Sequence, residues 1–139
     1  MSAPSRDEPA RRWTELGSAA WPEVPVDPLV LVPTGSTEQH GPHLPFDTDS
    51  VVARAVATHA AARLPGPVVV APTIAFGASG EHADFPGTIS IGHVALRAVL
   101  IETVRSLDLW SGHIVFVNGH GGNVATLRQV VAEMRAEGH

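Results

Sequence analysis

Three short apolar runs constrain the fold of this chain more than any other feature. They span residues 29–33 (LVLVP), 68–72 (VVVAP) and 113–118 (HIVFVN), and they do not alternate with polar residues. The first two runs are typical of strands buried on both faces, as in parallel sheets covered by helices, and the third is expected to be a further strand. Stretches with helical character lie at 50–64, 94–109 and 124–136. The order strand, helix, strand, loop, helix, strand, helix predicts an α/β fold with parallel strands and right-handed crossovers.

The segment before the first strand has a different character. Residues 1–9 are polar and rich in proline and charge, and residues 11–20 are expected to hold a short helix carrying Trp13 and Leu16. Prolines then break the chain before residue 29. We therefore expect residues 1–28 to form an N-terminal tail with a short helix, and residues 29–139 to form one α/β domain. Asp49 or Ser50 is the expected N-cap of the first domain helix.

Composition excludes several classes of protein. The 139 residues suit one domain with a real core, and 9 basic against 14 acidic side chains, with no lysine, make nucleic-acid binding a poor prediction. No apolar run approaches the roughly 18–20 residues that span a membrane. The absence of cysteine excludes disulfides, thiolate ligands and a cysteine nucleophile, and it fits a cytoplasmic protein. Eight histidines direct attention to imidazole chemistry instead.

The residues that could carry chemistry all follow predicted strands. Glu38, His40 and Asp49 follow the first strand, Glu81 and His82 follow the second, and His120 follows the third. Ligands of such sheets bind beyond the carboxyl ends of the strands. We therefore expect these six side chains to gather at one edge of the sheet.

Four of them form a plausible metal centre. Glu38 and His40 are two residues apart, so in an extended segment they point to the same side, roughly 6.5 Å apart, and each could hold one of two adjacent ions. Asp49, near a helix N-terminus, has two oxygens that could bridge such a pair. A set of imidazoles and carboxylates without sulfur favours zinc, manganese or iron. The candidate ligands are Glu38, His40, Asp49 and His120; Glu81 and His82 are candidate pocket residues.

Each residue also has a simpler interpretation. A single histidine or glutamate near a turn is usually solvated or hydrogen-bonded, and Asp49 could be only a helix cap. Residues 118–123 (NGHGGN) could be only a tight turn, or a backbone cradle for phosphate. Four candidate ligands at the ends of parallel strands favour the metal centre. No comparable argument applies to four other histidines, namely His43, His59, His93 and His113, of which His113 is expected to open the third strand.

The motifs together resemble the creatininase family of metal-dependent amidohydrolases. They are residues 35–45 (GSTEQHGPHLP) with Asp49, then Glu81–His82 with residues 85–88 (FPGT), then residues 118–123. The resemblance covers about residues 29–136 and implies a three-layer α/β/α fold with a mainly parallel sheet. It implies two divalent metal ions, with Glu38 and His120 on one, His40 on the other and Asp49 between them. It also implies a homo-oligomer.

The resemblance further implies a hydrolase of amide or peptide bonds in which a metal-activated water replaces a side-chain nucleophile. Residues 32–49 are most similar to a family member that removes a C-terminal dipeptide from the precursor peptide of a ribosomally made redox cofactor. The alternatives are a creatininase-type hydrolase of cyclic amides and an inactive, shortened metal-binding module. Family members run to about twice this sheet, so the chain resembles their N-terminal part. Their later half supplies a glutamate to the second metal; in creatininase itself a glutamate stands where this chain has Gly122. We therefore expect an incomplete second metal site.

Overall fold

The computed structural model describes residues 13–139, which form a sheet of four parallel strands in the order β1-β3-β2-β4. The strands are β1 (Thr14–Glu15), β2 (Leu29–Thr34), β3 (Val68–Val70) and β4 (His113–Asn118). The helices are α1 (Thr48–Ala61), α2 (Gly92–Leu107) and α3 (Val124–Glu137). Single 3₁₀ turns lie at Leu16–Ser18, Trp21–Glu23, Gly80–His82 and Gly121–Asn123.

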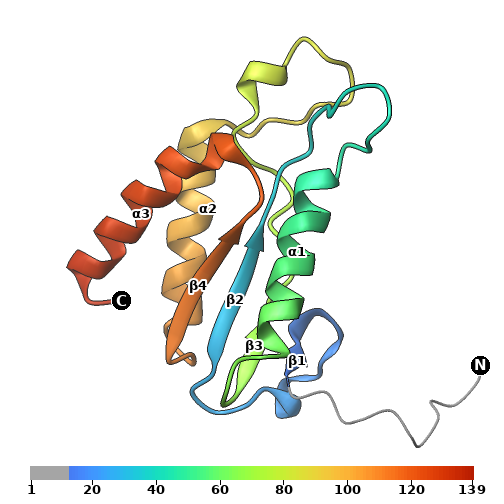
Figure 1. The fold of residues 1–139 in the computed structure, drawn as a ribbon. Coiled ribbons are helices and arrows are strands. Elements are labelled where there is room, and N and C mark those ends of the chain that lie inside the picture. The colour runs from blue at the N-terminus through green and yellow to red at the C-terminus, as the bar shows by residue number, and fades with distance from the viewer. Residues whose placement is uncertain (1–12) are drawn as a thin grey trace, which may run out of the picture.

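Helices cover both faces of this sheet. Figure 1 shows α1 on one side of β2 and β4, with α2 and α3 together on the other. Leu31 of β2 packs with Ala57 and Ala61 of α1, whereas Val30 and Val32 point to the opposite face. Because successive residues of a strand point to opposite faces, β2 must be apolar throughout. The expected three-layer α/β/α architecture is confirmed.

Small side chains let α1 lie close against the sheet. Ala53, Ala57 and Ala61 recur every four residues along the helix, and all three are buried. Residues at this spacing share one helix face, so the face that meets β2 carries only methyl groups. The close approach also fixes where the first turn of α1 lies relative to the end of β2.

The register of β2 and β4 aligns the loops that follow them. Leu29 pairs with His113 at one end of the two strands, and Thr34 pairs with Asn118 at the other. Because both strands end at the same level, the loop after β2 and the turn after β4 begin side by side. His113 opens β4 as expected.

The helix expected at residues 11–20 is wrong in the part of it that the structure describes. Thr14–Glu15 is a short strand that pairs with Val69–Val70 of β3, and only Leu16–Ser18 turns as a 3₁₀ helix. Trp13 packs against the cluster around Leu31. Without this strand, β3 would leave an edge of unpaired backbone groups, which favours pairing over a short helix containing a glycine. The tail at residues 1–9 lies outside the described residues.

The start of α1 also differs from expectation. The N-cap position belongs to Asp47 rather than Asp49 or Ser50, and the helix begins at Thr48, whose hydroxyl donates to the Pro45 carbonyl at 2.6 Å. Asp49 therefore lies in the first turn, and its carboxylate turns toward the end of the sheet instead of capping the helix. Among residues 13–139, no helix combines the length and the apolar character needed to cross a bilayer.

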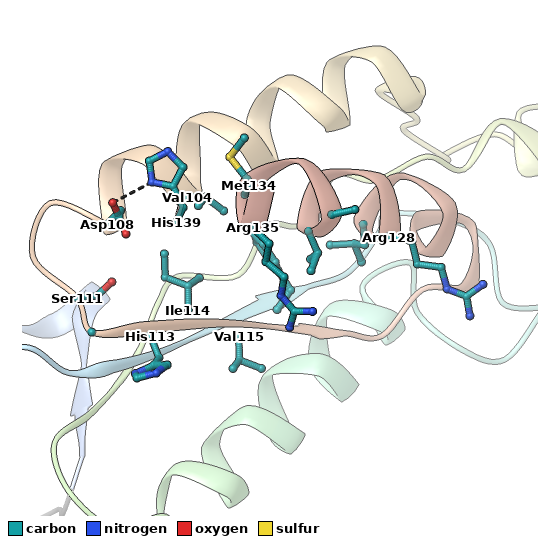
Figure 2. A pocket seen from close by; sticks show the side chains of 15 residues that line it. Val104, Asp108, Ser111, His113, Ile114, Val115, Arg128, Met134, Arg135 and His139 are labelled. Atoms are coloured by element: carbon teal, nitrogen blue, oxygen red, sulfur yellow. Dashed lines mark hydrogen bonds and ion pairs between the residues drawn. The ribbon is translucent and has the colours of Figure 1, made fainter. Parts of the chain in front are cut away.

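A groove of about 630 Å³ lies along β4, far along the strand from its carboxyl end. Figure 2 shows it between β4 and the helices α2 and α3, with Ile114, Met134 and His139 among its lining side chains. β4 is the last strand of the sheet, and Val115 on it is 45% exposed. This groove is thus separate from the cluster of candidate ligands.

Candidate metal centre

The structure brings the four candidate ligands together at the carboxyl end of β2 and β4. Glu38 and His40 come from the loop after β2, Asp49 from the first turn of α1, and His120 from the turn after β4. Glu38, Asp49 and His120 are buried, and His40 is partly buried.

Asp49 lies at the centre of this cluster. Its Oδ1 is 2.8 Å from Nε2 of His40, and its Oδ2 is 3.0 Å from Nδ1 of His120. The Ser36 hydroxyl donates a hydrogen bond of 2.6 Å to the same Oδ2. Glu38 Oε1 lies 3.2 Å from Nδ1 of His120. Each oxygen of Asp49 therefore faces a different histidine, which is the arrangement that a carboxylate shared by two ions requires.

Backbone carbonyls fix which nitrogen of each histidine carries a proton. Nε2 of His120 lies 2.9 Å from the Ala78 carbonyl, and Nδ1 of His40 lies 3.1 Å from the Glu38 carbonyl. A carbonyl only accepts, so these nitrogens donate, and in the neutral rings the other nitrogens present lone pairs. Those lone pairs point at carboxylates. A cation or a proton between them is needed to make the contacts favourable.

The pKa of His40 is raised, which also indicates that the cluster favours a positive charge. Burial is the largest single influence on this pKa and lowers it. The hydrogen bonds to the Glu38 carbonyl and to Asp49, with the negative charges of Asp49 and Glu38, outweigh burial and raise the pKa above its ordinary value.

Glu38 supplies a further sign that a cation belongs here. Its Oε2 is buried and has no hydrogen-bond partner. A buried carboxylate oxygen without a partner is costly, and a bound cation removes that cost. Two overlapping groups of donors lie close enough to hold an ion: Glu38 with His40 and Asp49, and Glu38 with Glu81 and His120. The residues present therefore fit a divalent metal of the zinc, manganese or iron type.

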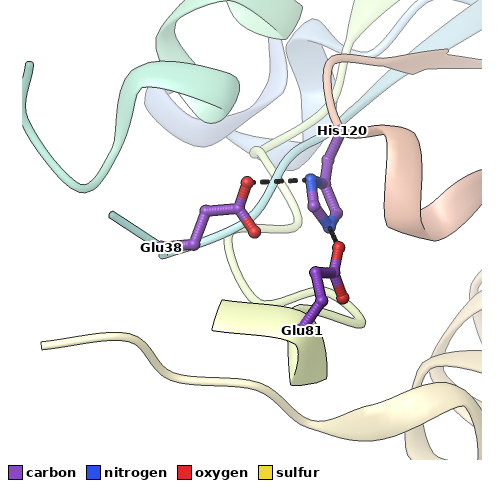
Figure 3. Close-up of side chains that lie close together, drawn as sticks. All are labelled: Glu38, Glu81 and His120. Carbon is purple, nitrogen blue, oxygen red and sulfur yellow. Dashed lines mark ion pairs between the residues drawn. The ribbon is translucent and has the colours of Figure 1, made fainter. Parts of the chain in front are cut away.

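Glu81 and Glu38 face different nitrogens of the His120 ring. Figure 3 shows Glu38 facing Nδ1 of His120 and Glu81 facing Nε2, at 3.9 Å for the second pair. That Nε2 donates to Ala78, so it has no lone pair to offer an ion shared with Glu81. The Glu81 side chain is 55% exposed. Glu81 therefore lies at the rim of the cluster, and His82 lies beside it.

Sequence reasoning assigned no role to several residues that hold the cluster in place. Ser36 fixes Asp49, and Asn123 joins two loops by donating to the Gly35 carbonyl and accepting from the Ala78 amide. Ser36 could have been found, because it shares the period-two face of Glu38 and His40. Asn118 donates to the His120 carbonyl. The polar side chains of the 118–123 turn are thus committed to contacts within the protein.

A substitution at Gly122 can test how tightly the turn after β4 packs on the ring of His120. A Cβ at residue 122 would lie 2.3 Å from the Ala78 carbonyl oxygen and 2.5 Å from Nε2 of His120. We expect Gly122→Ala to lower the free energy of unfolding by about 1–3 kcal/mol. We also expect zinc affinity to fall about tenfold or more as the ring is displaced. Urea unfolding and zinc titration of the purified chain measure the two effects.

Gly121→Ala is the matched control for this prediction, because a Cβ there meets nothing within 4 Å. It should behave like the unmodified chain in both measurements. Equal stability and equal zinc affinity of the two variants would contradict the packing described for His120.

Fold and cluster together define a class: a three-layer α/β/α protein with a carboxylate and imidazole centre at its strand ends. The chain belongs to the creatininase family, whose model, described as creatinine amidohydrolase, matches residues 12–139. It is 57% identical over 115 residues to the mycofactocin precursor peptide peptidase of Mycolicibacterium smegmatis, covering 80% of this chain and 47% of that protein. It is 52% identical over 132 residues to the peptidase of the same name from Mycobacterium ulcerans, covering 89% and 53%. The chain thus spans about half the length of these curated relatives.

Solved structures show the same likeness. A structure titled creatininase Mn matches with a TM-score of 0.74 and 26% identity, covering 92% of this chain and 54% of that one. A mutant creatininase of the Zn-Zn type matches with a TM-score of 0.66 and 28% identity, covering 81% and 47%. Both the fold and the family expected from the motifs are confirmed.

Proposed function

We propose that this chain carries the metal centre of a hydrolase that cuts amide bonds. Glu38, Asp49 and His120 would hold one divalent ion, and His40 with the second oxygen of Asp49 would contribute to another. The observation that carries the proposal is the geometry of Asp49, whose oxygens face Nε2 of His40 at 2.8 Å and Nδ1 of His120 at 3.0 Å. Both nitrogens direct lone pairs at it, because their partners in each ring donate to backbone carbonyls.

Zinc, iron or manganese is the proposed metal. The donors are imidazole nitrogens and carboxylate oxygens, which suit these ions. Neighbouring structures whose titles name Mn or Zn-Zn forms support the same range. A bound divalent ion polarises a carbonyl oxygen and lowers the pKa of water.

The chain's own side chains position the reacting groups. Ser36 holds the Asp49 carboxylate by its hydroxyl, and the Ala78 carbonyl holds the ring of His120 with Nδ1 toward the centre. These groups are fixed before a substrate arrives, which lowers the cost of reorganisation during the reaction.

The proposed substrate is a peptide, namely the mycofactocin precursor peptide, from which a C-terminal dipeptide is removed. The names of the relatives at 52% and 57% identity support this choice. We also propose that copies of the chain associate, because β4 is an edge strand with Val115 exposed on it, and exposed edges favour pairing.

The experiment is hydrolysis of the modified precursor peptide by purified chain loaded with zinc, manganese or iron, with release of the dipeptide followed by mass spectrometry. Chelator-stripped protein is expected to lose at least 90% of its activity and to regain it when metal is returned. His120→Ala should lose activity and at least one equivalent of metal. His113→Ala, a change at the exposed start of β4, is the matched control and should retain both. Full activity after chelation would contradict the proposal, and metal binding without hydrolysis would favour a binding module.

A further inference from the structure

A chain of hydrogen bonds connects the loop after β2 to His82, which lies in the 3₁₀ turn Gly80–His82. The backbone amide of Gly41 donates to Oε1 of Gln39 at 2.9 Å. The other side-chain atom of Gln39, Nε2, lies 2.8 Å from Nδ1 of His82. Because a backbone N–H can only donate, the atom of Gln39 that faces Gly41 must be the oxygen. The orientation of the Gln39 amide is thereby fixed.

This orientation sets the tautomer of His82. An amide NH₂ group donates and does not accept, so Nδ1 of His82 must be the acceptor of the Gln39 bond. In the neutral ring the proton then resides on Nε2. That Nε2 lies 3.7 Å from Oε2 of Glu38 and 3.9 Å from Oε1 of Glu81, too far for a hydrogen bond to either.

His82 therefore presents an unused donor at the mouth of the metal centre. Its side chain is 27% exposed, so a ligand can reach it. The nearest oxygen, Oε2 of Glu38, is itself buried and without a partner. A nitrogen that carries its proton has no lone pair for an ion, so in this tautomer Nε2 of His82 is a donor beside the proposed ligand Glu38 and not itself a ligand.

We infer that His82 is a hydrogen-bond donor that binds a peptide oxygen at the metal centre, and that Gln39 is the positioning residue that holds it in the donating tautomer. The inference rests on the proposed function. The oxygen is the carbonyl of the amide bond to be cut, which gains negative charge as the bond is attacked. A donor that already points at that position stabilises the developing charge more than one that must first rotate or change tautomer.

Nitrogen-15 NMR of histidine-labelled chain tests the role of Gln39 directly, because long-range correlations distinguish the two tautomers of each ring. The His82 signal, assigned as the one missing from His82→Gln, should show the Nε2–H form with and without zinc. Gln39→Glu should convert His82 to the Nδ1–H form, because a carboxylate at this position can only accept. Gln129→Glu makes the same change of charge at an exposed position of α3 and should leave the tautomer unchanged.

Activity and metal content test the role of His82. We expect His82→Leu and Gln39→Glu each to lower kcat by about 100-fold with the zinc content unchanged. His82→Gln, which keeps an N–H donor, should retain more of the kcat than His82→Leu. Loss of zinc in His82→Leu, an Nδ1–H tautomer in the unmodified chain, or an unchanged tautomer in Gln39→Glu would each overturn the inference. If no form of the chain hydrolyses the peptide, the proposed function fails, while the NMR result still decides the role of Gln39.

Discussion

Asp49→Asn is expected to abolish metal binding while leaving the metal-free chain at least as stable as before. The substitution keeps the shape of the side chain and one oxygen to accept from the Ser36 hydroxyl. It removes the negative charge that faces His40 at 2.8 Å and His120 at 3.0 Å. Since Asp49 is the one residue proposed to contact both ions, we expect zinc affinity to fall by more than about 100-fold, beyond what loss of a supporting residue costs.

The expected stability of the metal-free Asp49→Asn chain has an electrostatic cause. Asp49 and Glu38 both approach Nδ1 of His120, at 3.0 and 3.2 Å, so two buried carboxylates share one imidazole. Like charges held together out of water destabilise the folded state, and the asparagine removes one of them. A cluster that is unfavourable without its ion is common at functional sites.

Thermal and urea unfolding with and without zinc measure both effects. At a zinc concentration 100 times the Kd of the unmodified chain, that chain should gain about 2.7 kcal/mol, and Asp49→Asn should gain less than about 0.4 kcal/mol. Asp47→Asn is the matched control: it makes the same change two residues earlier, at the exposed N-cap position, and should keep the gain. Unaltered zinc stabilisation in Asp49→Asn would show that the ion binds elsewhere.

Strands β2, β3 and β4 were predictable because their sequence signal is local, although β4 at the edge of the sheet has no buried residue. Residues 113–118 form β4 with the expected bounds, and the runs at 29–33 and 68–72 match β2 and β3 within a few residues. β1 was not predictable, because two residues carry no periodicity and pair only through the edge that β3 offers. The start of α1 differed for a related reason: the cluster at the strand ends takes up the Asp49 carboxylate, so it cannot also cap the helix.

The membership of the candidate site was predictable, but its internal hydrogen bonds were not. Residues after parallel strands meet at one edge by topology alone, which places Glu38, Asp49 and His120 together. The proton on each ring depends on the partner of the other nitrogen. For His120 that partner is the Ala78 carbonyl, and for His82 it is Gln39, 43 residues away in sequence. Hydrogen bonds between residues so far apart follow no fixed spacing in the sequence, so they can be identified only from the folded structure.

Fusion of this chain to the second half of the Mycolicibacterium smegmatis relative is expected to raise peptide hydrolysis by about 100-fold or more. This chain covers 47% of that protein at 57% identity. Glu38 lies near both histidines, so with Glu38 assigned to the ion of His120, the second ion keeps only His40 and one oxygen of Asp49 among the described residues. Two protein ligands rarely hold a divalent ion against water. The rim of the cluster is open, with the Glu81 side chain 55% exposed. The added half would supply further ligands and pocket walls, and small errors in positioning alone can cost about 100-fold in rate.

Metal stoichiometry and turnover of the two proteins, compared at equal concentration, measure this expectation. We expect about one tightly bound ion per short chain and two per fusion, because Glu38, Asp49 and His120 complete one site while His40 alone begins the other. The added half should also cover the exposed Val115 on β4, which hydrogen exchange of the β4 amides would show as slower exchange. A fusion to an unrelated folded domain of similar size controls for solubility and should change none of these readouts. Two tight ions and equal turnover in the short chain would mean that its own residues complete both sites.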